Sequence, residues 1–268
     1  MIRKIDIHLH PMGGDTNMEK YLRIMDKHNV EAGLLHGLEE EGWERPEFKG
    51  ETANDALVKA VKAHPKRFYG SVCVNFSKGI EKTIDTIKKY GDQGCIGIKL
   101  FPNCGFDPNE DKYEPIWLEV EKRKMLVFSH CGWLLDNDKN PAMRISSLDG
   151  ASPFHFEVPA RRHPKINFIF AHFGGGATYL ETLVLTSRLK NAFADTCPGW
   201  GRWVFEQNMP GLSAMFRNKL LYGTDNIGEV YGLDETWWTN KLTSLGFTLQ
   251  DIHMYFYENS AKILGIVN

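Results

Sequence analysis

The chain has 268 residues, of which 42% are hydrophobic and 25% are charged, and its formal net charge is −2 at pH 7. This length suits one large domain, and the balanced charge excludes the basic face or stripe that is typical of a nucleic-acid-binding protein. There is neither an apolar run that could span a bilayer nor a Cys-x-x-Cys pair, and no apolar signal-peptide core follows Met1. We therefore expect one domain over residues 1–268, in a reducing cytoplasm, without a membrane or nucleic-acid partner.

Eight short runs with the character of strands alternate with helical patterns along the chain. The first run, Ile5-Asp6-Ile7-His8-Leu9-His10, alternates apolar and polar residues as a strand does. Strands are expected at residues 5–10, 30–36, 68–75, 94–101, 125–130, 166–172, 191–197 and 219–225. Helices are expected at residues 17–27, 52–63, 80–90, 115–124, 153–162, 178–190, 234–245 and 249–264, with a long loop after residue 197.

This alternation is the pattern of parallel βαβ units. Eight such units in a chain of this length predict an α/β fold, a (β/α)₈ TIM barrel in a single domain. The alternative is an open doubly wound sheet, but the Gly-x-Gly-x-x-Gly fingerprint expected after its first strand is missing.

Polar side chains gather at the carboxyl ends of the predicted strands, where (β/α)₈ barrels carry their chemistry. These residues are His8, His10, Lys99, His130, His172 and Asp225. His8 and His10 point to the same side of the first strand, ~7 Å apart along the backbone. Imidazole nitrogens and carboxylate oxygens are ligands of Zn²⁺ and similar ions, so the pattern predicts a metal centre at the barrel mouth. Ordinary solvated strand ends are the alternative, and the agreement of several positions argues against it.

The same segments resemble the amidohydrolase superfamily, specifically its amidohydrolase-related (amidohydrolase 2) branch, which includes aminocarboxymuconate-semialdehyde decarboxylase and related lactonases. The segments that carry the resemblance are Ile5-Asp6-Ile7-His8-Leu9-His10, Gly97-Ile98-Lys99-Leu100, Val127-Phe128-Ser129-His130-Cys131-Gly132, Phe168-Ile169-Phe170-Ala171-His172-Phe173-Gly174-Gly175, Leu221-Tyr222-Gly223-Thr224-Asp225 and the closing Glu258-Asn259-Ser260-Ala261-Lys262. The set in this order is specific, whereas no single segment is. In one departure, Thr224-Asp225-Asn226 stands where the family often has Ser-Asp followed closely by Pro, which leaves the shape of the adjoining loop open.

The resemblance implies that His8, His10, His130 and Asp225 hold one divalent ion, most simply Zn²⁺, with Mn²⁺ or a second ion as alternatives. Such an ion lowers the pKa of bound water toward ~7. The resemblance also implies that His172 stands beside the ion as an acid, a base or an electrostatic partner, and that Asp225 is a ligand, a general base, or both. A structural histidine bonded to the backbone is the alternative for His172.

Lys99 has two functional interpretations. In some binuclear family members a lysine on this strand carries CO₂ and bridges two metal ions. In the branch resembled here one ion is more usual, and Lys99 would remain an ammonium that binds a substrate carboxylate or oxyanion. A lysine that extends from the barrel mouth into solvent is a third alternative. Three cysteines that follow strand ends, Cys104, Cys131 and Cys197, are interpreted as core residues, and an approach to the site is the alternative.

Aromatic and basic residues fall on the loops expected after strands two, five and seven. They are Trp43, Trp133, Arg144, Trp200, Arg202 and Trp203. The rings suit an apolar pocket lining, and the two arginines suit a bidentate clamp on a carboxylate, so we expect a small substrate that bears a carboxylate. The rings could instead cover the barrel surface or form a homodimer contact, and the sequence does not separate these interpretations.

We expect a metal-dependent hydrolase in which activated water attacks an amide, ester or lactone carbonyl. The alternative is a metal-dependent non-oxidative decarboxylase of a small unsaturated or aromatic carboxylic acid, because it would use the same ligand set. A non-enzymatic barrel with a structural metal fits less well. Structural zinc sites are usually closed by four strong ligands, and here a fifth polar residue crowds the centre.

Overall fold

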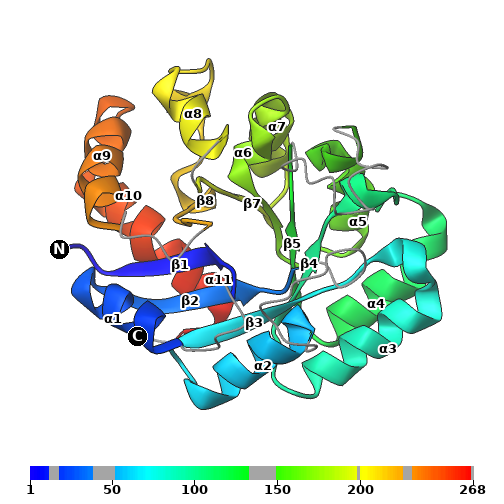
Figure 1. Cartoon of the computed structure of the whole chain (residues 1–268). Helices are drawn as coiled ribbons and strands as arrows, with labels where there is room; N and C mark the ends of the chain where they lie inside the picture. Colours follow the sequence, from blue (N-terminus) through cyan, green and yellow to red (C-terminus); the bar gives the residue numbers. More distant parts are fainter. Residues whose placement is uncertain (12–17, 39–51, 133–148, 198–199, 226–230, 267–268) are drawn as a thin grey trace, which may run out of the picture.

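The computed structural model describes residues 1–11, 18–38, 52–132, 149–197, 200–225 and 231–266 (Figure 1). Its strands form one sheet in the order β1 to β8, and every neighbouring pair is parallel. The strands are β1 (Lys4–Leu9), β2 (Val30–His36), β3 (Phe68–Cys73), β4 (Gly97–Leu100), β5 (Leu126–Ser129), β6 (Phe168–Phe170), β7 (Ala192–Asp195) and β8 (Leu220–Leu221).

Backbone hydrogen bonds close this sheet into a ring. The Ile7 N–H donates to Tyr222 O at 3.0 Å, and the Asp225 N–H donates to His8 O at 2.8 Å. These bonds join β1 to the segment that directly follows β8. The predicted (β/α)₈ TIM barrel is therefore confirmed.

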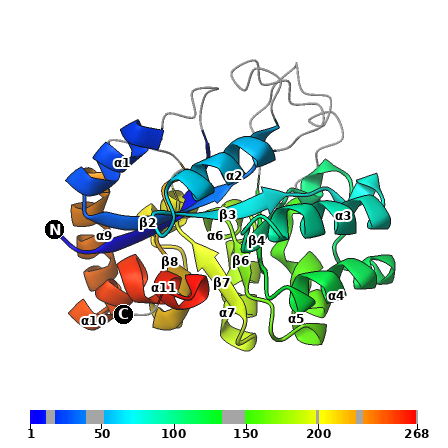
Figure 2. The same cartoon turned by 90° about the horizontal axis from the view of Figure 1, so that it is seen from below.

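Helices surround the ring of strands (Figure 2). They are α1 (Met18–Lys27), α2 (Ala53–Ala63), α3 (Ile80–Gly91), α4 (Glu114–Lys122), α5 (Glu157–Arg162), α6 (His172–Gly175), α7 (Tyr179–Arg188), α8 (Trp200–Glu206), α9 (Tyr231–Ser244), α10 (Leu249–His253) and α11 (Asn259–Leu264), with a π-helical turn at Met254–Glu258. As predicted, α2 begins after Thr52, whose side chain accepts the Asp55 N–H at 3.1 Å. Among the described residues, no helix is long and apolar enough to cross a membrane.

The alternation of side chains divides each strand between the helices and the barrel interior. In the paired strands β4 and β5, Ile98 and Val127 join the large apolar cluster that also holds Trp117 of α4. Their neighbours Lys99 and Phe128 contact each other instead, with the ammonium 4.4 Å from the ring centroid. This alternation points every second side chain of a strand into the barrel, where the polar residues of the site lie.

Several sequence predictions about local structure are wrong, and the eighth strand, expected at residues 219–225, spans only Leu220–Leu221. The segment expected as a loop after residue 197 contains α8, in which Gly201, Val204 and Phe205 are buried at the i, i+3, i+4 spacing of an amphipathic helix. The strand expected to end at His172 ends at Phe170. The φ of His172, 55°, lies in the left-handed region and cannot continue a strand. The short segment α6 that begins there is a tight turn, in which Phe173 (φ 49°) and Gly174 (φ 80°) are left-handed as well.

Candidate metal centre

The ends of β1 and β8 bring three of the predicted site residues together. The Nε2 atoms of His8 and His10 lie 3.2 Å and 3.1 Å from Asp225 Oδ1. These three ligand atoms all fall within 4.8 Å of one another. His8 is fully buried, whereas the Asp225 side chain is 35% exposed, so the cluster opens toward solvent through the carboxylate.

A buried carboxylate, Asp6, fixes the place of Asp225. Asp6 Oδ1 accepts the backbone N–H groups of His8 at 3.0 Å and Thr224 at 3.1 Å, and its Oδ2 accepts the Thr224 hydroxyl at 2.6 Å. Asp225 itself has a φ of 55°, a left-handed conformation that costs about 1–3 kcal/mol outside glycine. The Asp6 bonds hold the turn in place, and Thr224 supplies the hydroxyl that the serine of the resembled family would supply.

Hydrogen bonds at the rear of the two imidazoles orient them. His8 Nδ1 donates to Asp195 Oδ2 at 2.9 Å, and His10 Nδ1 donates to the carbonyl oxygen of His36 at 3.1 Å. A carboxylate and a carbonyl can only accept, so both Nδ1 atoms carry the proton and both Nε2 atoms present a lone pair to the centre. Burial lowers the pKa of His8 to about 4, which keeps this imidazole neutral at pH 7, as a metal ligand must be.

The carboxylates of the cluster are ionised at neutral pH. Burial alone would raise the pKa of Asp225, but the facing imidazoles of His8, His10 and His172 outweigh it and hold the pKa below its ordinary value. Burial opposes ionisation of Asp195 as well, and the bond from His8 is the main reason that its pKa falls to about 2. Neutral nitrogens beside an anionic oxygen form a donor set that fits a divalent cation such as Zn²⁺.

His130 and His172 lie on the next part of the rim, after β5 and β6. His172 Nε2 is 4.0 Å from Asp225 Oδ2, and its ring lies 5.0 Å from that of His130. His130 is stacked on Phe101 with 5.4 Å between ring centroids. Its buried Nε2 has no hydrogen-bond partner among the described residues, as expected of a nitrogen available to a ligand. His130 does not join the compact group of His8, His10 and Asp225.

Two glycines allow the loops after β5 and β6 to meet. A Cβ on Gly175 would lie 2.2 Å from Gly132 Cα, which no other residue type permits. Both glycines have positive φ, 69° and 89°. The run of glycines after His172 thus has a structural cause, because it lets the two backbones touch and brings His130 and His172 side by side.

Lys99 lies inside the barrel. The residue is fully buried, and its Nζ lies 3.5 Å from His8 Nε2 and 5.1 Å from the centroid of Phe101. Burial lowers its pKa, against the pull of Asp225 and Asp195. The alternative of a lysine that extends into solvent is therefore wrong, and the ammonium faces the predicted centre.

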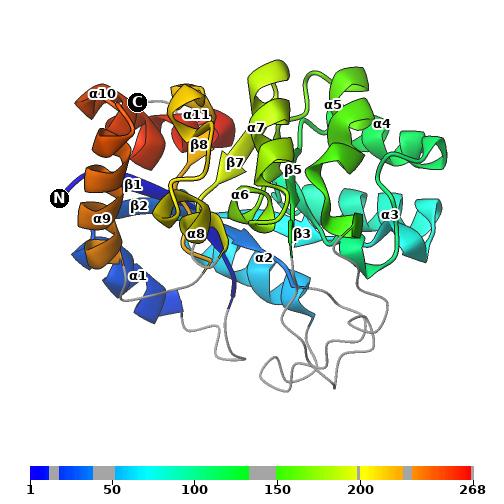
Figure 3. The same ribbon diagram turned by 90° about the horizontal axis from the view of Figure 1, so that it is seen from above.

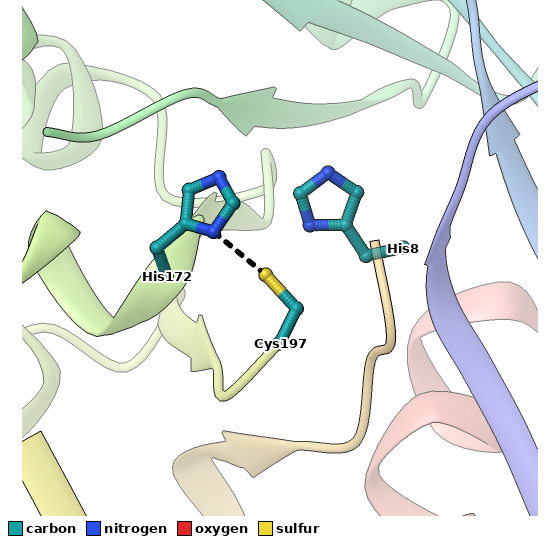
Figure 4. Close-up of side chains that lie close together, drawn as sticks. All are labelled: His8, His172 and Cys197. Carbon is teal, nitrogen blue, oxygen red and sulfur yellow. Dashed lines mark hydrogen bonds between the residues drawn. The ribbon is translucent and has the colours of Figure 1, made fainter. Parts of the chain in front are cut away.

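Sequence reasoning missed three contributors. His36 ends a predicted strand, and Asp195 lies two residues before the end of another and ends the observed β7, so the rule that singled out Asp225 and Lys99 could have found both. Cys197, interpreted as a core residue, has its Sγ 2.9 Å from His172 Nδ1 (Figure 4). With His8 and His172 it forms a second group whose ligand atoms lie within 4.8 Å of one another.

The predicted substrate-binding residues are partly placed. Trp43, Trp133 and Arg144 lie outside the described residues. Trp200 and Trp203 of α8 are 48% and 38% exposed, with ring centroids 5.8 Å apart.

Helix α8 lies beside α6 (Figure 3). A Cβ on Gly176 would come within 3.0 Å of the Trp200 ring, so this indole packs next to the segment that follows His172. The Arg202 guanidinium pairs with Glu206 at 2.7 Å and lies 4.3 Å from the Trp237 ring centroid. Trp200 is thus close to the histidine rim, whereas these contacts hold Arg202 between α8 and α9.

The sequence also matches a known protein family. The amidohydrolase family pattern Amidohydro_2 matches residues 5–266, nearly the whole chain. The chain belongs to this amidohydrolase family. No curated protein matches the amidohydrolase in sequence.

Several solved structures share the fold of this amidohydrolase at low identity. An uncharacterized TIM-barrel protein from Bordetella bronchiseptica is 14% identical, with a TM-score of 0.71 and coverage of 98% of this chain and 99% of its own. A probable 2-pyrone-4,6-dicarboxylic acid hydrolase from Acinetobacter baumannii is 15% identical (TM-score 0.64, coverage 99% and 100%). A 2,6-dihydroxybenzoate decarboxylase from Rhizobium is 16% identical (TM-score 0.67, coverage 99% of each chain).

Proposed function

We propose that this amidohydrolase is a metal-dependent hydrolase that acts on an amide, ester or lactone carbonyl of a small substrate. The observation that carries the proposal is the convergence of two imidazole Nε2 atoms on Asp225 Oδ1, at 3.2 Å and 3.1 Å, with both Nδ1 protons bonded away from the centre. Nitrogens arranged in this way present their lone pairs to the centre and are oriented for a cation.

His8, His10 and Asp225 would hold one divalent ion. His130 lies outside this compact group, and its unpartnered Nε2 makes it the candidate for a fourth ligand. Zn²⁺ suits three nitrogens and one carboxylate, and Mn²⁺ is the alternative. When bound, such an ion polarises a substrate carbonyl and makes water acidic enough to react at neutral pH.

The protein's own residues would then manage protons and charge. Asp225 is part-exposed, and its contacts with the β1 imidazoles are made by Oδ1, so its Oδ2 would take the proton of the attacking water and return it to the leaving group. The Lys99 ammonium, 3.5 Å from His8 Nε2, would stabilise the negative charge that develops on the carbonyl oxygen. His172 would add a second hydrogen bond to that charge from the part of the rim that follows β6.

Substrate selection would fall to the aromatic and basic residues of the rim. The exposed indole of Trp200 next to the His172 segment offers a flat apolar surface. We retain Trp133 as a candidate for the apolar lining. Arg144 and Arg202 are the candidates that bind a substrate carboxylate, Arg202 after release from its pair with Glu206.

Non-oxidative decarboxylation of a small aromatic or unsaturated acid is the second candidate. A structure of the same fold belongs to 2,6-dihydroxybenzoate decarboxylase, and the same cluster could orient an acid whose carboxylate leaves as CO₂. In that reaction a proton is delivered to carbon and no water is consumed.

Turnover in heavy-oxygen water separates the two reactions. We expect the zinc-loaded protein to act on a member of a panel of lactones, esters and amides, with solvent oxygen in the carboxylate product. Activity should vanish in Asp225→Ala and persist in Glu119→Gln, a carboxylate on α4 that pairs with Arg123 outside the site. Release of CO₂ from aromatic acids without uptake of solvent oxygen would refute hydrolysis. Inactivity on both classes at full metal content would favour a structural metal.

A further inference from the structure

Cys197 contacts His172, a histidine of the rim that lies outside the group of His8, His10 and Asp225. Its Sγ lies 2.9 Å from His172 Nδ1, and both side chains are buried, on the side of His172 that faces β7 (Figure 4). Burial raises the pKa of the Cys197 thiol well above its ordinary value, and the nearby Asp195 carboxylate raises it further. The sulfur therefore keeps its proton at neutral pH.

The partner of Nδ1 distinguishes His172 from the two β1 histidines. The Nδ1 atoms of His8 and His10 face a carboxylate and a carbonyl oxygen, which only accept hydrogen bonds. His172 Nδ1 faces a thiol, which has a proton to donate and a sulfur that accepts weakly, whereas an imidazole nitrogen accepts strongly. The favoured bond therefore runs from S–H to Nδ1, and the single proton of the neutral imidazole lies on Nε2.

Asp195 holds both partners in this geometry. Its Oδ1 accepts the backbone N–H of His172 at 2.9 Å and that of Cys197 at 3.0 Å. Its Oδ2 accepts His8 Nδ1. One buried carboxylate thus fixes the backbone positions of the Cys197–His172 pair and the tautomer of a neighbouring imidazole.

We propose that Cys197 is a positioning residue that fixes His172 as the Nε2–H tautomer. The Nε2–H points into the centre, 4.0 Å from Asp225 Oδ2, and has no lone pair for a cation. His172 is therefore a neutral hydrogen-bond donor to the negative charge that develops on the substrate. His8 and His10, with the opposite tautomer, are ligands. The catalytic consequence rests on the proposed function, whereas the tautomer itself does not.

The tautomer can be measured without substrate. Long-range proton–nitrogen correlation spectra of the zinc-loaded full chain, with nitrogen-labelled histidine, report which ring nitrogen is protonated, and the His172 signals are those lost in His172→Gln. We expect Nε2–H in the wild type and in Cys197→Ser, whose hydroxyl still donates. A mixture of tautomers is expected in Cys197→Ala. A wild-type His172 that carries its proton on Nδ1, or a Cys197→Ala spectrum unchanged from wild type, would overturn the proposal.

Kinetics supply the second readout. In Cys197→Ala we expect kcat to fall about 10-fold or more while KM and zinc content stay at the wild-type level, because orienting partners are worth about 10–100-fold. Cys197→Ser should recover most of the loss. Cys131→Ala is the matched control. Cys131 is also buried, and its Sγ bonds to the backbone oxygen of Ser129. The kcat of this variant should equal that of the wild type. If the tautomers behave as expected and no substrate turns over, the proposed reaction fails and the role of Cys197 stands.

Discussion

Replacing Asp195 by asparagine tests how the centre is oriented. The side chain is fully buried and accepts three hydrogen bonds, two from backbone N–H groups to Oδ1 and one from His8 Nδ1 to Oδ2. In Asp195→Asn the amide oxygen can keep the two backbone bonds. The amide nitrogen then faces His8 Nδ1 as a donor, so His8 must place its proton on Nε2 and lose the lone pair that would bind the ion.

The magnitude follows from the one bond that changes, because the charged His8–Asp195 bond is replaced by a neutral bond of reversed direction. A hydrogen bond to a charged group contributes about 1.5–3 kcal/mol, and removing the orienting partner of a metal-binding histidine costs about 10–100-fold in affinity. We therefore expect the zinc dissociation constant of Asp195→Asn to rise by about 10–100-fold. The free energy of unfolding of the metal-free protein should fall by up to about 1.5–3 kcal/mol, the contribution of one hydrogen bond to a charged group.

Competition with a chromogenic chelator measures the zinc affinity, and denaturant unfolding measures the stability. Glu119→Gln is the matched control because Glu119 is a buried carboxylate, 9% exposed, bonded to Arg123 on α4. It should lose stability and keep the wild-type zinc affinity. If Asp195→Asn also kept wild-type zinc affinity, Asp195 would serve the fold alone and the orienting role would be refuted.

Three further changes test other parts of the site. In the metal-free protein, the pKa of His8 is about 4 in the folded chain and 6.5 in the unfolded chain. Between these two pH values the unfolded chain therefore binds a proton that the folded chain does not. Stability should fall by about 3 kcal/mol as pH drops through that window, and a flat denaturation midpoint would contradict this. Gly175→Ala should lower the free energy of unfolding several times more than Gly265→Ala. Both glycines have a φ of 69°, but only at Gly175 would the new Cβ meet a backbone, that of Gly132. Equal shifts in melting temperature would show that this backbone contact does not contribute. Lys99→Met should keep one ion per chain and lose about 100-fold or more in kcat, whereas loss of metal would indicate a carboxylated lysine.

The barrel and the core of the centre could be predicted because both follow from local patterns. Alternation of strands and helices fixes the ring, and strand alternation puts His8 and His10 on one side. Asp195 and His36 obey the same strand-end rule and could have been included. The helix at α8 was visible in the spacing of its buried residues Gly201, Val204 and Phe205.

Other features depend on contacts between distant segments, which one sequence does not contain. The left-handed backbone of His172 ends β6 early and turns the side chain toward β7, where Cys197 meets it. The touching backbones of Gly132 and Gly175 likewise depend on the packing of two loops. Strand periodicity carries no information about side-chain direction beyond the last strand residue, so the partner of His172 could not be predicted.

Elemental analysis of the purified protein and three variants tests the central claim most directly. We predict one divalent ion per wild-type chain, none in His8→Ala or Asp225→Ala, and a full complement in His172→Ala, because the Nε2 proton of His172 excludes it from the ligand set. A wild-type chain without metal, or a His172→Ala protein as empty as Asp225→Ala, would contradict the account.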